Sequence, residues 1–238
     1  MSLEPDEPAL SDEYAWLDGG QDFVVCAYYT PNYKAYALEL RHSLEVLGIS
    51  HFLKGYRSAN SWEAATRLKP TFIAECLVKF EPLHILYVDA DALVLHPLGL
   101  LDKISTDVAL SFEAEGKHKK RPQLRAVPGT IYVRNTPGGW RFVEAWRNAE
   151  RELGAWATDS VMLRIAIARL QGLTITNLPR TYAKGDPSSE QVIQHLRASR
   201  LNFSRNRRRN YRKRRQLALI AVTLAVLASG AAYLYISG

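Results

Sequence analysis

The chain has 238 residues, 47% of them hydrophobic, which is enough for one domain with a sizeable core and a small appendage. Its net charge of +7 is local, because eight Lys and Arg residues lie between Arg205 and Arg215. Without those eight, 23 basic residues stand against 24 acidic ones, so the body is nearly neutral. This balance argues against a basic nucleic-acid-binding domain, and we expect no nucleic acid partner.

The two cysteines and the N-terminal segment narrow the class of protein further. Cys26 and Cys76 are too few for a disulfide framework, and we expect both to be buried thiols in a reducing compartment. Residues 1–20 are acidic, contain prolines and lack an apolar core, so they do not form a signal peptide. We interpret them as a flexible leader, in which Tyr14 to Leu17 could dock on a domain that spans residues 21–203.

The first elements of this domain predict an α/β fold. Phe23 to Tyr29 is a continuous apolar run and predicts a buried strand. Apolar residues near a period of 3.6 predict a helix over residues 33–47, and His51 to Tyr56 predicts a second strand. A strand, a helix and a strand in this order indicate a parallel sheet.

The rest of the domain continues to alternate helices and strands. Residues 58–69 are expected to form a polar loop or a short helix, and residues 179–203 are expected to be irregular. The other expected elements are a helix over 71–80, the strand 85–88, strands over 108–113 and 124–134, helices over 137–153 and 159–170, and a strand over 173–178.

Two carboxylates follow one of these apolar strands. Ile85 to Val88 predicts a buried strand, and Asp89 and Asp91 leave its end one residue apart. Side chains at i and i+2 of an extended chain point the same way, so both carboxylates can converge on one divalent cation, Mg²⁺ or Mn²⁺. The alternative is a solvated turn that caps a following helix. The apolar residues 92–95 disfavour it, because a helix would begin with a polar first turn.

The C-terminal residues predict a membrane anchor. Residues 217–236 carry no charge and, as a helix, would span about 30 Å, the thickness of a bilayer core. The basic segment 204–216 precedes them directly. This order predicts a single-pass protein whose catalytic domain lies in the cytoplasm, with anionic lipid as a partner. The alternatives are a buried core helix for 217–236 and a nucleic-acid-binding patch for 204–216.

With these segments placed, residues 22–203 resemble a GT-A glycosyltransferase, a nucleotide-diphospho-sugar transferase. Four segments carry the resemblance in the expected order, namely Val24 to Thr30, Lys69 to Ile73, Ile85 to Asp91, and Val192 to His195. The resemblance implies a Rossmann-like GT-A fold with a mostly parallel central sheet. It also implies a UDP- or GDP-sugar donor and an Mn²⁺ or Mg²⁺ cofactor.

The resemblance also assigns residues to the site. It implies that Asp89, Asp91 and His195 hold the metal. The donor-binding positions that it implies are Ala27, Tyr28, Thr30, Lys69, Asp89, Ala90, Gly129, Thr130 and Arg200.

The segment Thr158-Asp159-Ser160 resembles the place where related families carry Asp-Gln at a helix start, with the Asp facing the sugar. Ser160 here replaces the usual Gln, which puts some polar contacts to the sugar in doubt. Asp159 is the candidate catalytic residue. It would be the general base of an inverting enzyme, or would orient the sugar in a retaining one. The sequence leaves both roles open.

The function expected from these patterns is metal-dependent transfer of a sugar from a nucleotide-diphospho-sugar, with a membrane or envelope acceptor suggested by the anchor. One alternative is a phosphatase of the HAD type that uses Asp89 as its nucleophile. That class places its acidic pair close to the N-terminus, whereas two βα elements precede Asp89 here. The other alternative is an inactive, membrane-anchored protein that binds sugar nucleotides.

Overall fold

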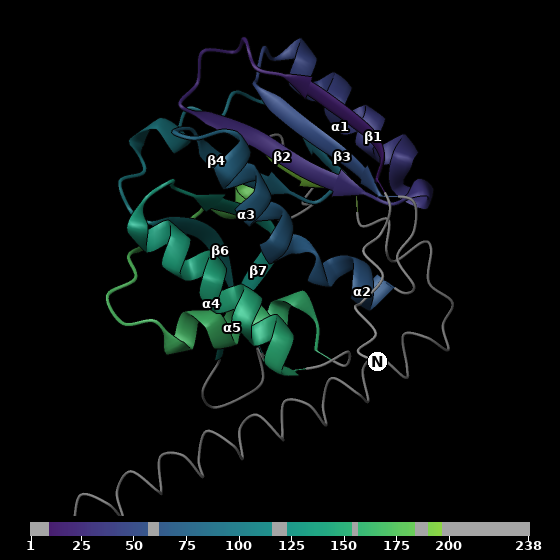
Figure 1. The fold of residues 1–238 in the computed structure, drawn as a ribbon. Coiled ribbons are helices and arrows are strands. Elements are labelled where there is room, and N and C mark those ends of the chain that lie inside the picture. The colour runs from purple at the N-terminus through teal and green to yellow at the C-terminus, as the bar shows by residue number, and fades with distance from the viewer. Residues whose placement is uncertain (1–9, 57–61, 116–122, 154–156, 184–189, 197–238) are drawn as a thin grey trace, which may run out of the picture.

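A computed structural model describes residues 10–56, 62–115, 123–153, 157–183 and 190–196. Its main sheet contains β1 (Leu10–Trp16), β2 (Phe23–Tyr29), β3 (His51–Tyr56), β4 (His84–Val88), β6 (Val108–Glu115), β7 (Gln123–Val133) and β8 (Ile175–Asn177). The seven strands lie in the order β1-β3-β2-β4-β7-β6-β8 (Figure 1). A small second sheet pairs β5 (Ala92–Val94) with β9 (Ile193–His195).

Most strands of the main sheet run in one direction. β2 pairs in parallel with β3 and β4, and β6 pairs in parallel with β8. β1 and β7 run against their neighbours, so five of the seven strands share a direction. The predicted α/β class with a mostly parallel central sheet is confirmed.

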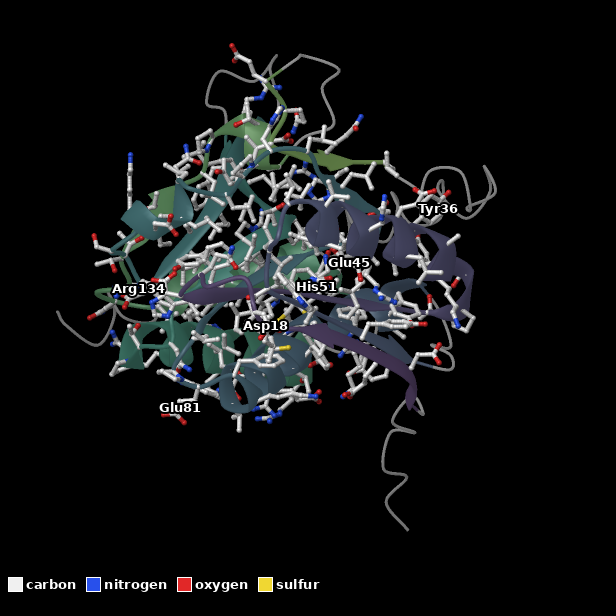
Figure 2. All side chains as sticks on the ribbon, turned by 90° about the horizontal axis from the view of Figure 1, so that it is seen from above. Asp18, Tyr36, Glu45, His51, Glu81 and Arg134 are labelled. Carbon is white, nitrogen blue, oxygen red and sulfur yellow. The ribbon has the colours of Figure 1, made fainter. Side chains whose placement is uncertain are left out.

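Helices cover both faces of this sheet. They are α1 (Lys34–Val46), α2 (Trp62–Arg67), α3 (Lys69–Lys79), α4 (Pro137–Leu153) and α5 (Asp159–Arg169). α1 packs on one face, whereas α3, α4 and α5 pack on the other. Figure 2 shows Glu45 of α1 and Glu81, which follows α3, on opposite sides, with His51 of β3 between them.

The two-sided cover explains why the central strands are continuous apolar runs. All seven residues of β2 are buried. Val24, Cys26 and Tyr28 face the core beneath α3 and α4, while their neighbours along the strand face the core beneath α1. A parallel strand with both faces buried needs apolar residues at every position, which is the pattern that the sequence shows.

α4 begins where the sequence places it. The hydroxyl of Thr136 accepts a hydrogen bond from the Gly139 N–H at 3.2 Å, as a helix cap does. The helix then buries Phe142, Val143 and Trp146, whose spacing places them on one stripe. This stripe packs α4 against α5 and α3 and fixes the start of α5, which carries Asp159.

Two parts of the chain differ from expectation. Residues 10–16 of the expected leader form β1, an edge strand antiparallel to β3, because half-buried side chains such as Tyr14 and Trp16 alternate with exposed ones. The acidic residues of the segment make this alternation of side chains difficult to recognise in the sequence. In the region expected to be irregular, Ile193–His195 forms β9, and Arg180–Tyr182 forms a short 3₁₀ helix. These elements are too short to show a period in the sequence.

The predicted localisation, a membrane protein with a C-terminal anchor, is contradicted. In the part of the chain that the structure describes, no helix is both long and apolar enough to cross a bilayer. Even α4, with 17 residues, would span only about 26 Å and carries six charged side chains. Residues 204–216 and 217–236, which were expected to form the anchor, lie outside the described residues.

Candidate active site

The candidate site lies beside the end of β4, at a switch in strand direction. On one side β4 pairs in parallel with β2, and on the other it pairs antiparallel with β7. The Asp89 N–H donates to the carbonyl of Gly129 at 2.9 Å, which extends the pairing with β7 by one residue. Ligands of open α/β sheets bind at the carboxyl ends of strands near such switch points.

Three predicted metal ligands converge at this edge. Asp89, Asp91 and His195 each offer one ligand atom, and these atoms lie within 4.8 Å of one another. The small sheet brings the histidine there, because Ala92 of β5 stands opposite His195 of β9. The Leu196 N–H also donates to the Asp91 carbonyl at 2.8 Å. Two carboxylates and one imidazole suit a divalent cation such as Mn²⁺.

Gly129 lies directly beneath two of these side chains. A Cβ added at this position would stand 2.9 Å from His195 Cε1, 3.1 Å from Asp89 Oδ2 and 3.3 Å from His195 Nδ1. The carboxylate and the imidazole therefore converge over the backbone of β7. The glycine is required because its lack of a side chain permits this close approach.

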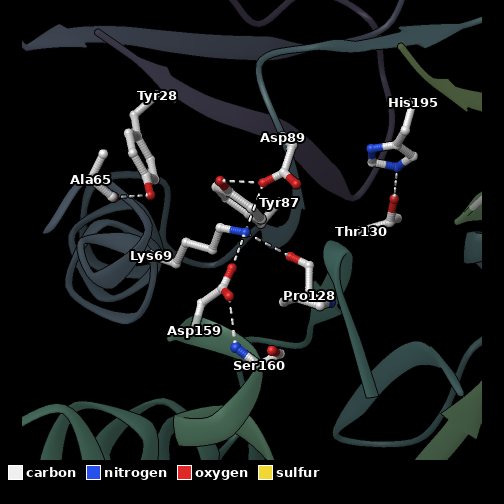
Figure 3. Close-up of polar contacts among 10 residues, drawn as sticks. All are labelled: Tyr28, Ala65, Lys69, Tyr87, Asp89, Pro128, Thr130, Asp159, Ser160 and His195. Carbon is white, nitrogen blue, oxygen red and sulfur yellow. Dashed lines mark hydrogen bonds and ion pairs between the residues drawn. The ribbon is translucent and has the colours of Figure 1, made fainter. Parts of the chain in front are cut away.

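Lys69 connects one of the candidate metal ligands, Asp89, to α5. Its ammonium donates to Asp159 Oδ2 at 2.6 Å, to Asp89 Oδ1 at 2.8 Å and to the carbonyl of Pro128 at 3.2 Å (Figure 3). Lys69 is the first residue of α3 and only 3% of its surface is exposed. A lysine buried to this degree must be paired, and three acceptors surround this one.

The carboxylates of Asp159 and Asp89 keep Lys69 charged. Burial by itself would lower the pKa of this ammonium. The nearby carboxylates of Asp159 and Asp89 outweigh burial and raise the pKa above its ordinary value. Lys69 is therefore a permanent cation that links two carboxylates from different elements.

Tyr87 is a site residue that the sequence analysis did not identify. Its hydroxyl donates to Asp89 Oδ1 at 3.0 Å, and the Lys69 ammonium lies 5.4 Å from the centre of its ring. Burial raises the pKa of this hydroxyl well above its ordinary value, so it remains a donor. The signal was present in the sequence, because residues i and i+2 of a strand share a face and a buried tyrosine needs a polar partner.

Asp159 begins α5 and is nearly buried, with 6% of its surface exposed. Its Oδ1 accepts the Ser160 N–H at 2.7 Å, while Oδ2 accepts from Lys69. Thr158 precedes the helix as predicted, but its side chain makes no capping bond; its hydroxyl lies 3.2 Å from that of Ser160 instead. Asp159 thus has a partner on each carboxylate oxygen.

Four of the other predicted donor-binding residues lie on β2, directly after it, and between Asp89 and Asp91. Ala27 is fully buried, and the hydroxyl of Tyr28 donates to the Ala65 carbonyl at 2.6 Å. Thr30 follows β2 and donates to Asn32 Oδ1 at 2.7 Å. Ala90 lies between the two candidate metal-ligand carboxylates and is 6% exposed. Arg200 lies outside the described residues.

Comparison with known proteins identifies the fold. No protein-family model matches the sequence, and no curated protein matches it. A solved glycosyltransferase involved in the glycosylation of the major capsid of PBCV-1 superposes with a TM-score of 0.57 at 12% identity, over 83% of this chain and 98% of that one. The chain has a glycosyltransferase fold. The predicted GT-A fold is therefore confirmed.

Further glycosyltransferase structures match with lower TM-scores. The glycosyltransferase GlyE of Streptococcus pneumoniae gives 0.48 at 13% identity, over 73% of this chain and 54% of that one. The galactosyltransferase LgtC, solved with donor and acceptor sugar analogues, also gives 0.48 at 12% identity, over 73% and 86%.

Proposed function

We propose that the protein is a metal-dependent glycosyltransferase that moves a sugar from a nucleotide-diphospho-sugar, a UDP- or GDP-sugar, to an acceptor hydroxyl. One observation carries the proposal. On a glycosyltransferase fold, Asp89, Asp91 and His195 bring their ligand atoms within 4.8 Å of one another. Asp89 is also linked through Lys69 to Asp159 at the start of α5. The candidate metal ligands and the candidate sugar-facing carboxylate thus belong to one connected site.

The residues fit a hard divalent cation. Carboxylate oxygens and an imidazole nitrogen are ligands that Mn²⁺ accepts, and Asp89, Asp91 and His195 supply them. A cation bound there would supply Lewis-acid stabilisation of the negative charge on the leaving nucleoside diphosphate.

The two oxygens of Asp89 have different tasks in this proposal. Oδ1 accepts hydrogen bonds from Lys69 and Tyr87, which fixes the rotation of the carboxylate. Oδ2 is the oxygen that approaches Gly129, on the side where His195 lies. The carboxylate is therefore held in place before a cation arrives, so its ordering costs little on binding.

Asp159 acts in the second of its two candidate roles, which is to orient the donor sugar. A general base needs an oxygen that can take a proton from the acceptor. Oδ2 of Asp159 lies 2.6 Å from a permanent cation, and Oδ1 accepts the Ser160 N–H. Both oxygens therefore already accept a hydrogen bond, so the carboxylate is held in one orientation, which suits a fixed acceptor for sugar hydroxyls and a negative charge near a developing positive one.

Lys69 serves the site by positioning these carboxylates. Its ammonium is surrounded by Asp89, Asp159 and the Pro128 carbonyl, and 4% of the side chain is exposed. This enclosed ammonium adds positive charge to the site and holds the end of β4 and the start of α5 in fixed positions. Contacts with the donor would come from less buried residues, such as Thr30 after β2.

Donor hydrolysis and transfer test the proposal. The full chain is incubated with UDP- and GDP-sugars in Mn²⁺, and release of the nucleoside diphosphate is followed by chromatography. We expect release with at least one donor, and a loss of at least about 100-fold in Asp91→Asn. The matched control is Asp18→Asn, an exposed carboxylate in the loop before β2. Equal activity of the folded Asp91→Asn variant would reject the metal centre.

A further inference from the structure

We infer that Thr130 is a positioning residue that sets the ring orientation of His195, so that Nδ1 is the nitrogen presented to the cation. The inference deepens the proposed metal centre and rests on it. It also gives Thr130 a different role from direct contact with the donor, which the sequence resemblance implied.

The first observation is that Thr130 is fully buried. This residue lies on β7 opposite Val88, the last residue of β4, and none of its surface is exposed. A donor molecule cannot reach a side chain that solvent cannot reach. A fully buried hydroxyl nevertheless requires a hydrogen-bond partner, and Thr130 Oγ1 has one in His195 Nε2 at 2.9 Å.

The second observation is the position of the other ring nitrogen of His195, Nδ1. Nδ1 of His195 and Oδ2 of Asp89 approach the same point above Gly129, at 3.3 and 3.1 Å from a Cβ placed there. Figure 3 shows the nitrogen that bonds Thr130 directed toward that residue and the other one on the side of Asp89. The ring therefore points one nitrogen at β7 and the other at the carboxylate.

The position of the proton on the imidazole decides which ring nitrogen can bind a metal. A neutral ring carries one N–H donor and one lone-pair acceptor, and only the lone pair binds a metal. A ring whose Nδ1 lone pair binds the cation carries its proton on Nε2, and the Thr130 hydroxyl can accept that N–H. Metal-ligating histidines commonly donate their second N–H to a fixed acceptor in this way. The pairing of β5 with β9 places the backbone of His195, and Thr130 fixes its ring.

Two substitutions separate the hydroxyl from the shape of the side chain. Thr130→Val keeps the volume and removes the oxygen, whereas Thr130→Ser keeps the oxygen. The environment of the ring is read from the ¹H and ¹⁵N signals of the imidazole in the metal-free full chain. His195→Gln identifies the signals. Affinity for Mn²⁺ alone is measured by electron paramagnetic resonance.

We expect wild type and Thr130→Ser to show the same imidazole signals and similar Mn²⁺ affinity. Thr130→Val should shift those signals and bind Mn²⁺ at least about 10-fold more weakly. Unchanged Mn²⁺ affinity in a folded Thr130→Val would overturn the inference alone. Absence of Mn²⁺ binding in wild type would instead contradict the proposed metal centre.

Discussion

Lys69 and Asp159, from the first turns of α3 and α5, form an ion pair of 2.6 Å in which neither side chain is more than 9% exposed. The same ammonium reaches Asp89 at 2.8 Å. One cation therefore joins the candidate metal centre to the candidate sugar-facing carboxylate. The proposed function and the stability of the site would depend on the same contact.

Removal of this cation should destabilise the fold. Lys69→Met leaves two carboxylates without their main partner, and we expect a loss of about 3 kcal/mol in the free energy of unfolding. Chemical denaturation measures it. Arg169→Met breaks an exposed pair with Glu152 and should change stability by less than about 0.5 kcal/mol.

A second substitution tests whether the cost of Lys69→Met comes from unpaired charge. Adding Asp159→Asn to Lys69→Met removes one of the two stranded carboxylates, so the double variant should recover part of the lost stability. Asp159→Asn alone completes the comparison. If the double variant loses as much stability as Lys69→Met and Asp159→Asn lose together, Lys69 and Asp159 are not directly coupled.

Tyr87→Phe should weaken metal binding more than it weakens the fold. The change removes the hydroxyl that holds Asp89 Oδ1 and leaves the buried ring in place. We expect Mn²⁺ affinity to fall by about 10-fold, with a stability loss of about 1 kcal/mol. Tyr28→Phe is the matched control, because its hydroxyl bonds a backbone carbonyl instead. An equal loss of affinity in both variants would show that Tyr87 has no special role.

Gly129→Ala should impair the site through a steric clash. The added methyl group would lie 2.9 Å from the imidazole of His195, a distance that forces a shift of the ring or of β7. We expect Mn²⁺ binding and donor turnover each to fall by more than about 10-fold. Gly99→Ala is the control, because no atom lies within 4 Å of a Cβ at that position. Normal Mn²⁺ affinity in Gly129→Ala would refute the close convergence over β7.

Mild acid should destabilise the fold through two histidines away from the site. Burial lowers the pKa of His51 and of His84 below the ordinary value. The unfolded chain then binds more protons, so stability falls as pH decreases below about 6.5. Denaturation midpoints between about pH 7.5 and 5.5 measure the slope. His84→Gln should flatten it, and an equal slope in that variant would exclude a contribution from His84.

The sequence was sufficient for those parts of the fold that are buried on both sides. β2 and β3 lie at the predicted residues. β2 is recognisable because a strand covered by helices on both faces is a continuous apolar run. β9 could not be found in the same way. It has three residues and owes its existence to pairing with β5, about a hundred residues earlier in the chain.

The same division applies to the candidate site. Asp89 and Asp91 are recognisable because they end an apolar strand, and the resemblance supplied His195 and Asp159. The contacts of Lys69 with two carboxylates and of Thr130 with His195 depend on side-chain packing between distant elements. No local period encodes such contacts. Tyr87 is intermediate, since its position on the face of Asp89 is predictable and its contact with Lys69 is not.

The most direct test of the account is thermal unfolding of the full chain with a panel of UDP- and GDP-sugars, with and without Mn²⁺. A ligand that binds only the folded state raises its stability by mass action. The account predicts that at least one donor raises the midpoint only when Mn²⁺ is present, and that Asp91→Asn abolishes the shift. A cooperative unfolding transition that no donor shifts under either condition would contradict it.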